Sequence, residues 1–169
     1  QRLVGIVNSL PVTPDFVIHT GDVVTNPHPE SYALAAETFA ALDVPIYYVT
    51  GNHDPANDIH RYLPMGPKQD VADDRSALSY PFDIKGYRFV VLDARGPDEN
   101  DPQGLLSPVK LDLVRRETGP EGPPLTLFDH FPALPINSTW MDENMTLVNG
   151  LEFHNLLLPA RGRLRGVFQ

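Results

Sequence analysis

Hydrophobic positions in the first third of the chain follow two periodicities. Residues 16–20 and 45–49 are short apolar runs bounded by proline or glycine, which is typical of buried parallel strands. Between them, residues 29–42 carry apolar side chains at helical spacing. Residues 2–10 resemble the end of an amphipathic helix that the following prolines stop. Residues 16–49 therefore predict a β-α-β unit with parallel strands.

The rest of the chain predicts a different arrangement. Two apolar segments, 78–84 and 87–92, flank Lys85-Gly86, which is typical of an antiparallel hairpin. Ser107 and Pro108 are typical of an N-cap and a first helical turn. The remaining expected elements are helices at 107–117 and 150–158 and strands at 124–128 and 164–168. Because the chain shows no internal repeat and no linker-like change of composition, residues 1–169 predict a single mixed α/β domain.

Charge narrows the classes of partner that this chain can bind. The 169 residues carry a formal net charge of −9, and the isoelectric point is near 4.9. This balance argues against nonspecific nucleic-acid binding, which needs a basic surface. A phosphate substrate is compatible with it if bound metal cations reverse the local field. The acidic stretch 70–74 is expected to be a solvated loop, and Arg161, Arg163 and Arg165 are expected to be surface charges.

The absence of cysteine excludes several chemistries. Disulfides, thiolate zinc sites and cysteine nucleophiles all require a residue type that this sequence lacks. The sequence also shows no signal peptide and no apolar run of transmembrane length. A cytoplasmic protein that does not bind membranes is therefore the expectation.

Polar residues that can bind a metal follow two of the predicted strands. Gly21-Asp22 comes directly after the first strand, and Gly51-Asn52-His53-Asp54 follows the second. Ligands gather beyond the carboxyl ends of parallel strands, so the two loops are expected to lie together. The Asp22 carboxylate could bridge two cations, and the Asn52 amide oxygen could bind a hard metal without adding charge.

A third predicted strand end supplies His130, which could give an imidazole nitrogen to Mn, Fe, Co or Zn. Oxygen and imidazole ligands without thiolate suit a hydrolytic centre of two metals, which generates hydroxide at neutral pH and holds the phosphate from both sides. Simpler interpretations remain open: Asp22, Asn52 and His53 could be turn residues, and His130 could be a hydrogen-bonded polar residue. Asp129 is either a support for the site or a polar strand end, and Trp140 belongs to a pocket rim or to the core.

These motifs together resemble the calcineurin-like metallophosphoesterase superfamily. The resemblance implies a four-layer αββα fold, in which mixed β-sheets are sandwiched between helices. It implies two divalent metal ions, with Asp22 bridging both and with Asn52 and His130 binding one of them. His53 would then be catalytic, contacting the phosphate and protonating the leaving group, while Asp54 would orient His53 or its loop.

The chain also departs from the family pattern. That pattern begins with Asp-x-His on a first strand and ends with Gly-His-x-His, and neither motif occurs in this sequence. The expected domain is therefore truncated at both ends, and the expected fold is incomplete. Only Asp22, Asn52 and His130 match ligating positions, so metal binding is expected to be weak or incomplete. A sheet without its first strand would expose an edge, which would allow a homo-oligomer.

The resemblance predicts hydrolysis of a small phosphodiester. Residues 140–150 are similar to the branch that contains class III cyclic nucleotide phosphodiesterases and glycerophosphodiesterases, so a cyclic nucleotide is a candidate substrate. The alternative is a catalytically inactive fragment or scaffold that keeps the phosphoesterase fold. A phosphomonoesterase or nuclease of the same superfamily is a third reading, and the negative net charge disfavours the nuclease.

Overall fold

A computed structural model of the chain describes residues 2–69, 77–96 and 103–169. Its helices, in chain order, are α1 (Arg2–Asn8), α2 (Pro29–Phe39), α3 (Ala56–Tyr62), α4 (Pro108–Glu117), α5 (Thr139–Asn144), α6 (Gly150–Leu157) and a short 3-10 helix, η1 (Leu158–Ala160). Its strands are β1 (Val17–His19), β2 (Ile46–Tyr48), β3 (Tyr80–Ile84), β4 (Tyr87–Val91), β5 (Leu125–Phe128) and β6 (Leu164–Phe168). None of the helices in the described ranges has the length and hydrophobicity that a membrane span requires.

The first sheet has two strands, β1 and β2, which run parallel with Val17 opposite Ile46. Helix α2 connects them and covers one face, where the Phe39 ring lies 5.7 Å from the His19 ring and 5.9 Å from the Tyr48 ring. The predicted β-α-β unit is therefore confirmed. Because parallel strands point the same way, the loops that follow β1 and β2 leave the sheet at the same end.

The second sheet has the strand order β3-β4-β5-β6. Strands β3 and β4 form the predicted antiparallel hairpin, and β4, β5 and β6 run parallel. Lys85 and Gly86, at the hairpin turn, have φ angles of 49° and 79°. Two consecutive left-handed residues give a turn whose twist matches that of the flanking strands, which explains the tight connection.

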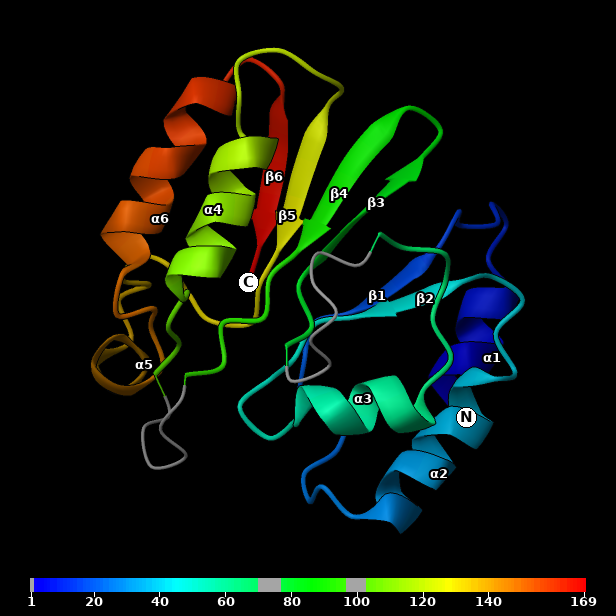
Figure 1. Ribbon diagram of the computed structural model, residues 1–169. Helices are drawn as coiled ribbons and strands as arrows, with labels where there is room; N and C mark the ends of the chain where they lie inside the picture. The colour runs from blue at the N-terminus through cyan, green and yellow to red at the C-terminus, as the bar shows by residue number, and fades with distance from the viewer. Residues whose placement is uncertain (1, 70–76, 97–102) are drawn as a thin grey trace.

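The two sheets pack face to face through an aromatic core, with helices on both outer sides (Figure 1). The Tyr47 ring of β2 stacks on the Phe82 ring of β3 at 3.8 Å, and Phe16 packs edge-on against both rings. On the other face of the second sheet, Val90 and Leu127 pack with α4 and α6 in a separate apolar cluster. The expected αββα arrangement is confirmed.

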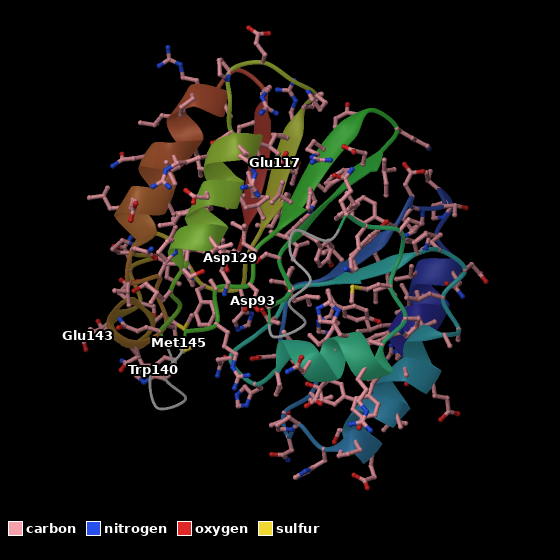
Figure 2. The ribbon with its side chains drawn as sticks, viewed as in Figure 1. Asp93, Glu117, Asp129, Trp140, Glu143 and Met145 are labelled. Atoms are coloured by element: carbon pink, nitrogen blue, oxygen red, sulfur yellow. The ribbon has the colours of Figure 1, made fainter. Side chains whose placement is uncertain are left out.

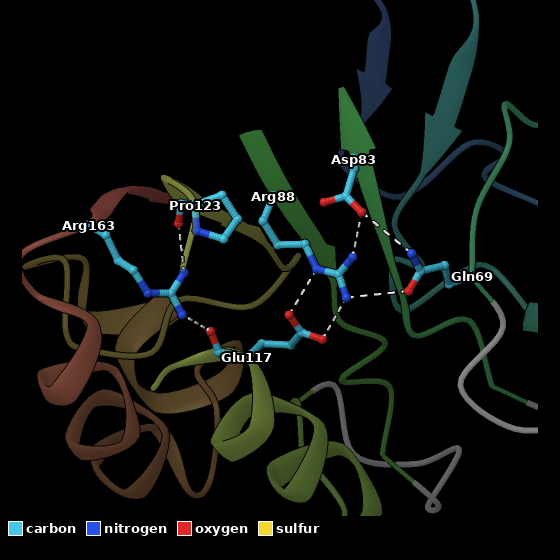
Figure 3. Close-up of polar contacts among 6 residues, drawn as sticks. All are labelled: Gln69, Asp83, Arg88, Glu117, Pro123 and Arg163. Atoms are coloured by element: carbon cyan, nitrogen blue, oxygen red, sulfur yellow. Dashed lines mark hydrogen bonds and ion pairs between the residues drawn. The ribbon is translucent and has the colours of Figure 1, made fainter. Parts of the chain in front are cut away.

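Polar contacts join the end of α4 to the amino end of β4 and to the segments before β5 and β6 (Figure 3). The Arg88 guanidinium donates to both oxygens of Glu117, at 2.9 and 2.8 Å, and to Asp83 at 2.8 Å. Arg163 donates to the backbone carbonyls of Glu117, Gly119 and Pro123. The expectation that Arg163 is a surface charge is therefore wrong, because carbonyls at a helix end lack partners within the helix and Arg163 supplies them.

Two helices were not expected from the pattern, and one cap differs from the prediction. The short helices α3 and α5 lie in segments without a clear periodicity. Ser107 does occupy the N-cap position of α4, but its side chain makes no cap hydrogen bond. The predicted acidic loop at 70–74 lies outside the described residues.

Candidate functional site

The loops after β1, β2 and β5 converge at the carboxyl ends of the two sheets. His130 follows β5, and its Nδ1 lies 2.8 Å from the backbone carbonyl oxygen of Thr20, which follows β1. The backbone N–H of His53, after β2, donates to Asp22 Oδ1 at 3.3 Å. The structure therefore brings Asp22, His53 and His130 together from distant parts of the sequence, as the strand-end rule predicts.

The contact with Thr20 determines which nitrogen of His130 can bind a metal. A carbonyl oxygen only accepts hydrogen bonds, so Nδ1 carries the proton and the Nε2 of the neutral ring has a free lone pair. Nε2 lies 3.7 Å from Asp22 Oδ2. Bonds from carboxylate or imidazole to a metal such as zinc measure about 2 Å, so one ion could contact both atoms. A backbone acceptor that fixes the ring in this way is common among metal-binding histidines.

Glycine is required where the loops approach one another. A Cβ on Gly51 would lie 2.1 Å from Asp22 Oδ1 and 2.3 Å from the Asp22 backbone nitrogen. A Cβ on Gly21 would lie 2.5 Å from His130 Nδ1, and Gly21 also has a φ of 106°. The two glycines therefore permit a spacing that no other residue would allow.

Asp54 is the hub that joins the first two loops. Its side chain is fully buried and accepts hydrogen bonds from the backbone N–H groups of Val23 at 2.9 Å, Val24 at 3.4 Å and Gly51 at 3.2 Å. The buried Tyr32 hydroxyl of α2 donates to it as well, at 3.3 Å. These bonds fix the loop that carries Asp22 against the loop that carries Asn52 and His53.

The remaining predicted residues of this loop differ in exposure. Asn52 is half-buried, and His53 is exposed, with its backbone fixed by Asp22 and its side chain on the surface. The exposed His53 imidazole is accessible to a substrate, whereas the fully buried Asp54 is not. The roles predicted for Asn52, His53 and Asp54 remain predictions.

The donor set fits part of a metal centre. Asp22 and His130 lie close enough to share an ion, and the half-buried Asn52 lies on the adjacent loop, where its role as a ligand stays a prediction. Over the described ranges, however, no group of three or more His, Cys, Asp or Glu side chains is arranged to hold a metal. Divalent ions of this kind need roughly four to six donors each. The described residues therefore fit one shared ion better than a complete pair.

Two buried carboxylates lie beside this site, near the carboxyl ends of β4 and β5 (Figure 2). Asp129 Oδ1 accepts from the backbone N–H groups of His130 at 2.7 Å and Phe131 at 3.4 Å, while Oδ2 is buried without a partner among the described residues. Burial raises the pKa of Asp129 to about 7. The Asp129 carboxylate therefore holds the backbone of the loop that carries His130, which favours a support for the site over a merely polar strand end.

Asp93 was missed in the sequence, although it directly follows the predicted strand 87–92. It is 3% exposed and accepts from the Thr50 hydroxyl at 2.7 Å and from the Leu78 N–H at 2.9 Å. Thr50 precedes Gly51, so Asp93 links the second sheet to the loop with Asn52 and His53. The strand-end rule that selected Asp22 would also have selected Asp93.

Trp140 lies on α5 and is 63% exposed (Figure 2). The reading of Trp140 as a core residue is therefore wrong, because a short helix at the surface has no apolar layer to cover its ring. A pocket rim remains a prediction.

His19, next to this site, should make stability sensitive to acid. Burial lowers its pKa from the ordinary value of 6.5, and its Nδ1 is buried without a partner in the described part of the chain. Below that value the unfolded chain binds a proton that the folded chain resists, so the free energy of unfolding falls as the pH falls. We expect His19→Leu to reduce the loss of stability between about pH 7.5 and about pH 5.5, as measured by urea unfolding.

His28 provides the matched control for this experiment. It is exposed at the start of α2, and its side chain makes no cap hydrogen bond. His28→Leu should keep the pH dependence of the original chain. An equal reduction in both variants, or none in His19→Leu, would contradict the assignment.

Sequence comparisons find relatives over most of the chain. A sequence model described as calcineurin-like phosphoesterase matches residues 1–157. A probable glycerophosphodiester phosphodiesterase, GpdQ, from Arcobacter nitrofigilis is 33% identical over 138 residues, covering 80% of this chain and 48% of that protein. A 3′,5′-cyclic adenosine monophosphate phosphodiesterase, CpdA, from Pseudomonas aeruginosa is 31% identical over 147 residues, covering 86% of this chain and 49% of that protein.

A probable cyclic nucleotide phosphodiesterase from Rhodococcus erythropolis is 32% identical over 142 residues, covering 80% of this chain and 44% of that protein. The chain thus spans about half the length of the curated relatives that it matches. The similarity to glycerophosphodiester and cyclic nucleotide phosphodiesterases agrees with the branch that residues 140–150 predict.

Proposed function

Because the chain belongs to the calcineurin-like phosphoesterase family, we propose that it hydrolyses a small phosphodiester, such as a cyclic nucleotide, at the strand-end site. The observation that supports this most is the pairing of Asp22 with His130. The contact between His130 Nδ1 and Thr20 leaves the Nε2 lone pair facing the Asp22 carboxylate, at 3.7 Å from Oδ2. A carboxylate oxygen and an imidazole nitrogen, each supplied by a different sheet, thus lie close enough to bind one cation.

We propose that Asp22, Asn52 and His130 hold divalent metal, chosen from Mn, Fe, Co and Zn by their oxygen and imidazole donors. When bound, the metal supplies positive charge that offsets the charge on the phosphate oxygens. The pair expected from the family would be held weakly by these donors alone.

The other residues of the site would act on the substrate directly or on the loops. The exposed His53 imidazole would hydrogen-bond a phosphate oxygen and donate a proton to the oxygen of the leaving group. Asp54 would keep His53 in place through its bonds to the loops after β1 and β2. Asp129 would keep His130 in place through the His130 backbone N–H.

The substrate class rests on the relatives and on the charge of the chain. Those relatives are named for glycerophosphodiesters and cyclic nucleotides, which are small molecules. A net charge of −9 suits a small substrate drawn to a local cation better than nonspecific binding to nucleic acid. A single domain, a cytoplasmic location and assembly into a homo-oligomer remain predictions of the sequence.

Hydrolysis of bis-p-nitrophenyl phosphate tests this function. We expect activity that rises with added Mn²⁺ and falls by about 100-fold or more in His53→Gln, because His53 loses its role as proton donor. Asn52→Ala should lose the activity that Mn²⁺ stimulates. Asn155→Ala, which changes an exposed asparagine on α6, should keep that activity. Activity that is insensitive to Mn²⁺ and to Asn52→Ala would count against the proposal.

A scaffold without a working metal centre is the second candidate. The specific observation in its favour is that the described residues contain no cluster of three or more His, Cys, Asp or Glu arranged around a metal. Titration with Mn²⁺ by calorimetry separates the two. If Mn²⁺ binds, and if Asn52→Ala and His130→Ala both weaken that binding, the enzyme is supported. If Mn²⁺ does not bind and no hydrolysis is seen, the scaffold is supported.

A further inference from the structure

A cavity of about 720 Å³ opens beside the candidate site. Its wall includes Asp93 and Arg95 after β4, Ala56 at the start of α3, and Ser107 and Lys110 in the first turn of α4. Figure 2 shows Asp93 at the carboxyl end of the second sheet, between α3 and α4. A volume of this size is typical of sites for small ligands.

The cavity is continuous with the loop that carries Asn52 and His53. Asp93 accepts from the Thr50 hydroxyl directly before that loop, and Ala56 follows it by a few residues. Burial raises the pKa of Tyr32, and the nearby Arg95 charge opposes this effect. The Tyr32 hydroxyl donates to Asp54, so the Arg95 charge acts on a residue that is bound to the candidate site.

Two cationic side chains of the cavity, Lys110 and Arg95, keep N–H donors that could bind a ligand. The Lys110 side chain is 12% exposed, and its ammonium lies 3.9 Å from Asp93 Oδ1, beyond hydrogen-bond distance. That oxygen already accepts from Thr50 and from the Arg95 backbone N–H. In the described parts of the chain, the Arg95 guanidinium forms no ion pair.

The two carboxylates of the cavity already have hydrogen-bond or ion-pair partners. Glu152 pairs with Arg115 of α4 at 3.2 Å, and Asp93 is bound by the Thr50 hydroxyl and by backbone N–H groups. The first turn of α4 adds a positive helix end, where the Ser107 side chain makes no cap bond. A nearly buried ammonium whose one counter-charge is too far away to accept a hydrogen bond is costly, and an anionic ligand that accepts from it would relieve that cost.

We propose that this cavity binds a phosphate group through Lys110 and Arg95, and that during hydrolysis it holds a phosphate of the substrate other than the one cleaved. The second part rests on the proposed function. It concerns small phosphodiesters that bear a further phosphate, whereas a cyclic nucleotide with a single phosphate would leave this cavity unoccupied. Arg95 would contact this group with its planar guanidinium, and Lys110 with its three N–H donors.

Binding without metal tests the cavity directly. We expect calorimetry on the full chain to show that thymidine 3′,5′-bisphosphate binds at least about tenfold more tightly than thymidine, which has no phosphate. Lys110→Met and Arg95→Gln should each bring this ratio close to one. Lys85→Gln, an exposed lysine in the hairpin turn that pairs with Asp15, should leave the ratio unchanged. Circular dichroism checks that each variant is folded.

Equal affinity for the two compounds, or a ratio that survives both Lys110→Met and Arg95→Gln, would overturn the inference. Arg95→Gln keeps the test decisive if Lys110→Met fails to fold, because the Arg95 side chain makes no ion pair in the described residues that the substitution would remove.

Hydrolysis separates this inference from the proposed function. The p-nitrophenyl ester of thymidine 5′-phosphate, with and without a 3′-phosphate, gives a matched pair of substrates in the presence of Mn²⁺. A higher kcat/KM for the ester with the extra phosphate supports both the proposed hydrolysis and the cavity inference. Equal values contradict the cavity inference and still support the proposed hydrolysis. If neither ester is cleaved but binding of the bisphosphate depends on Lys110 and Arg95, the cavity binds phosphate and the proposed hydrolysis is wrong.

Discussion

Replacing Asp54 by alanine is expected to lower the free energy of unfolding by roughly 3–5 kcal/mol. The fully buried carboxylate accepts from three backbone N–H groups and from the Tyr32 hydroxyl. Alanine would leave these donors without partners, and each buried donor that loses its partner costs about 1–3 kcal/mol. Urea unfolding followed by circular dichroism measures the change.

Two further variants make this result specific. Asp54→Asn keeps the size of the side chain and one accepting oxygen, so we expect an intermediate loss. Asp43→Ala removes an exposed carboxylate on the loop before β2 and should change stability by less than about 0.5 kcal/mol. If Asp54→Ala were as stable as Asp43→Ala, Asp54 would not be the hub of the site.

Substitution of Gly51 by alanine is expected to destabilise the chain by roughly 1–3 kcal/mol and to remove Mn²⁺ binding. The added Cβ would lie 2.1 Å from Asp22 Oδ1 and 2.3 Å from the Asp22 backbone nitrogen. The Asp22 backbone cannot yield easily, because the neighbouring Val23 N–H is bound to Asp54. The Asp22 carboxylate would be displaced from His130, and calorimetry with Mn²⁺ would show the loss.

Gly5→Ala is the matched control for this substitution. Gly5 lies inside α1, and a Cβ there would have nothing within 4 Å. Alanine favours the helix by up to about 1 kcal/mol, so Gly5→Ala should stabilise the chain and leave Mn²⁺ binding intact. A Gly51→Ala chain with normal stability and normal Mn²⁺ binding would refute the close packing of the two loops.

Much of the local structure follows from the linear pattern. The β-α-β unit around α2 was predicted because its strands are buried runs and its helix has an apolar stripe, and both are properties of neighbouring residues. The hairpin at Lys85-Gly86 was also predictable, because its signal is a short turn between two neighbouring apolar segments. Helices α3 and α5 were not, because they are short and depend on contacts with the rest of the fold, such as that of the fully buried Ile59 of α3.

Some features of the candidate site were likewise predictable from the sequence and others were not. Asp22, Asn52, His53 and His130 could be named from their positions after predicted strands, because parallel strands place their carboxyl ends together. The four donors that meet at Asp54 could not be predicted, nor could the link from Asp93 to Thr50 between the two sheets. These contacts depend on how two sheets face each other, and no short-range pattern encodes that arrangement.

The sequence alone was thus enough to assign the family and the strand-end residues, because both lie in local motifs such as Gly51-Asn52-His53-Asp54. Three-dimensional packing fixed the rest. It selected the His130 nitrogen that faces Asp22, since the Thr20 carbonyl is reached only when β5 lies beside the first sheet. It also enclosed Lys110 and Arg95 in one cavity, since residues after β4 and at the start of α4 meet only in the folded chain.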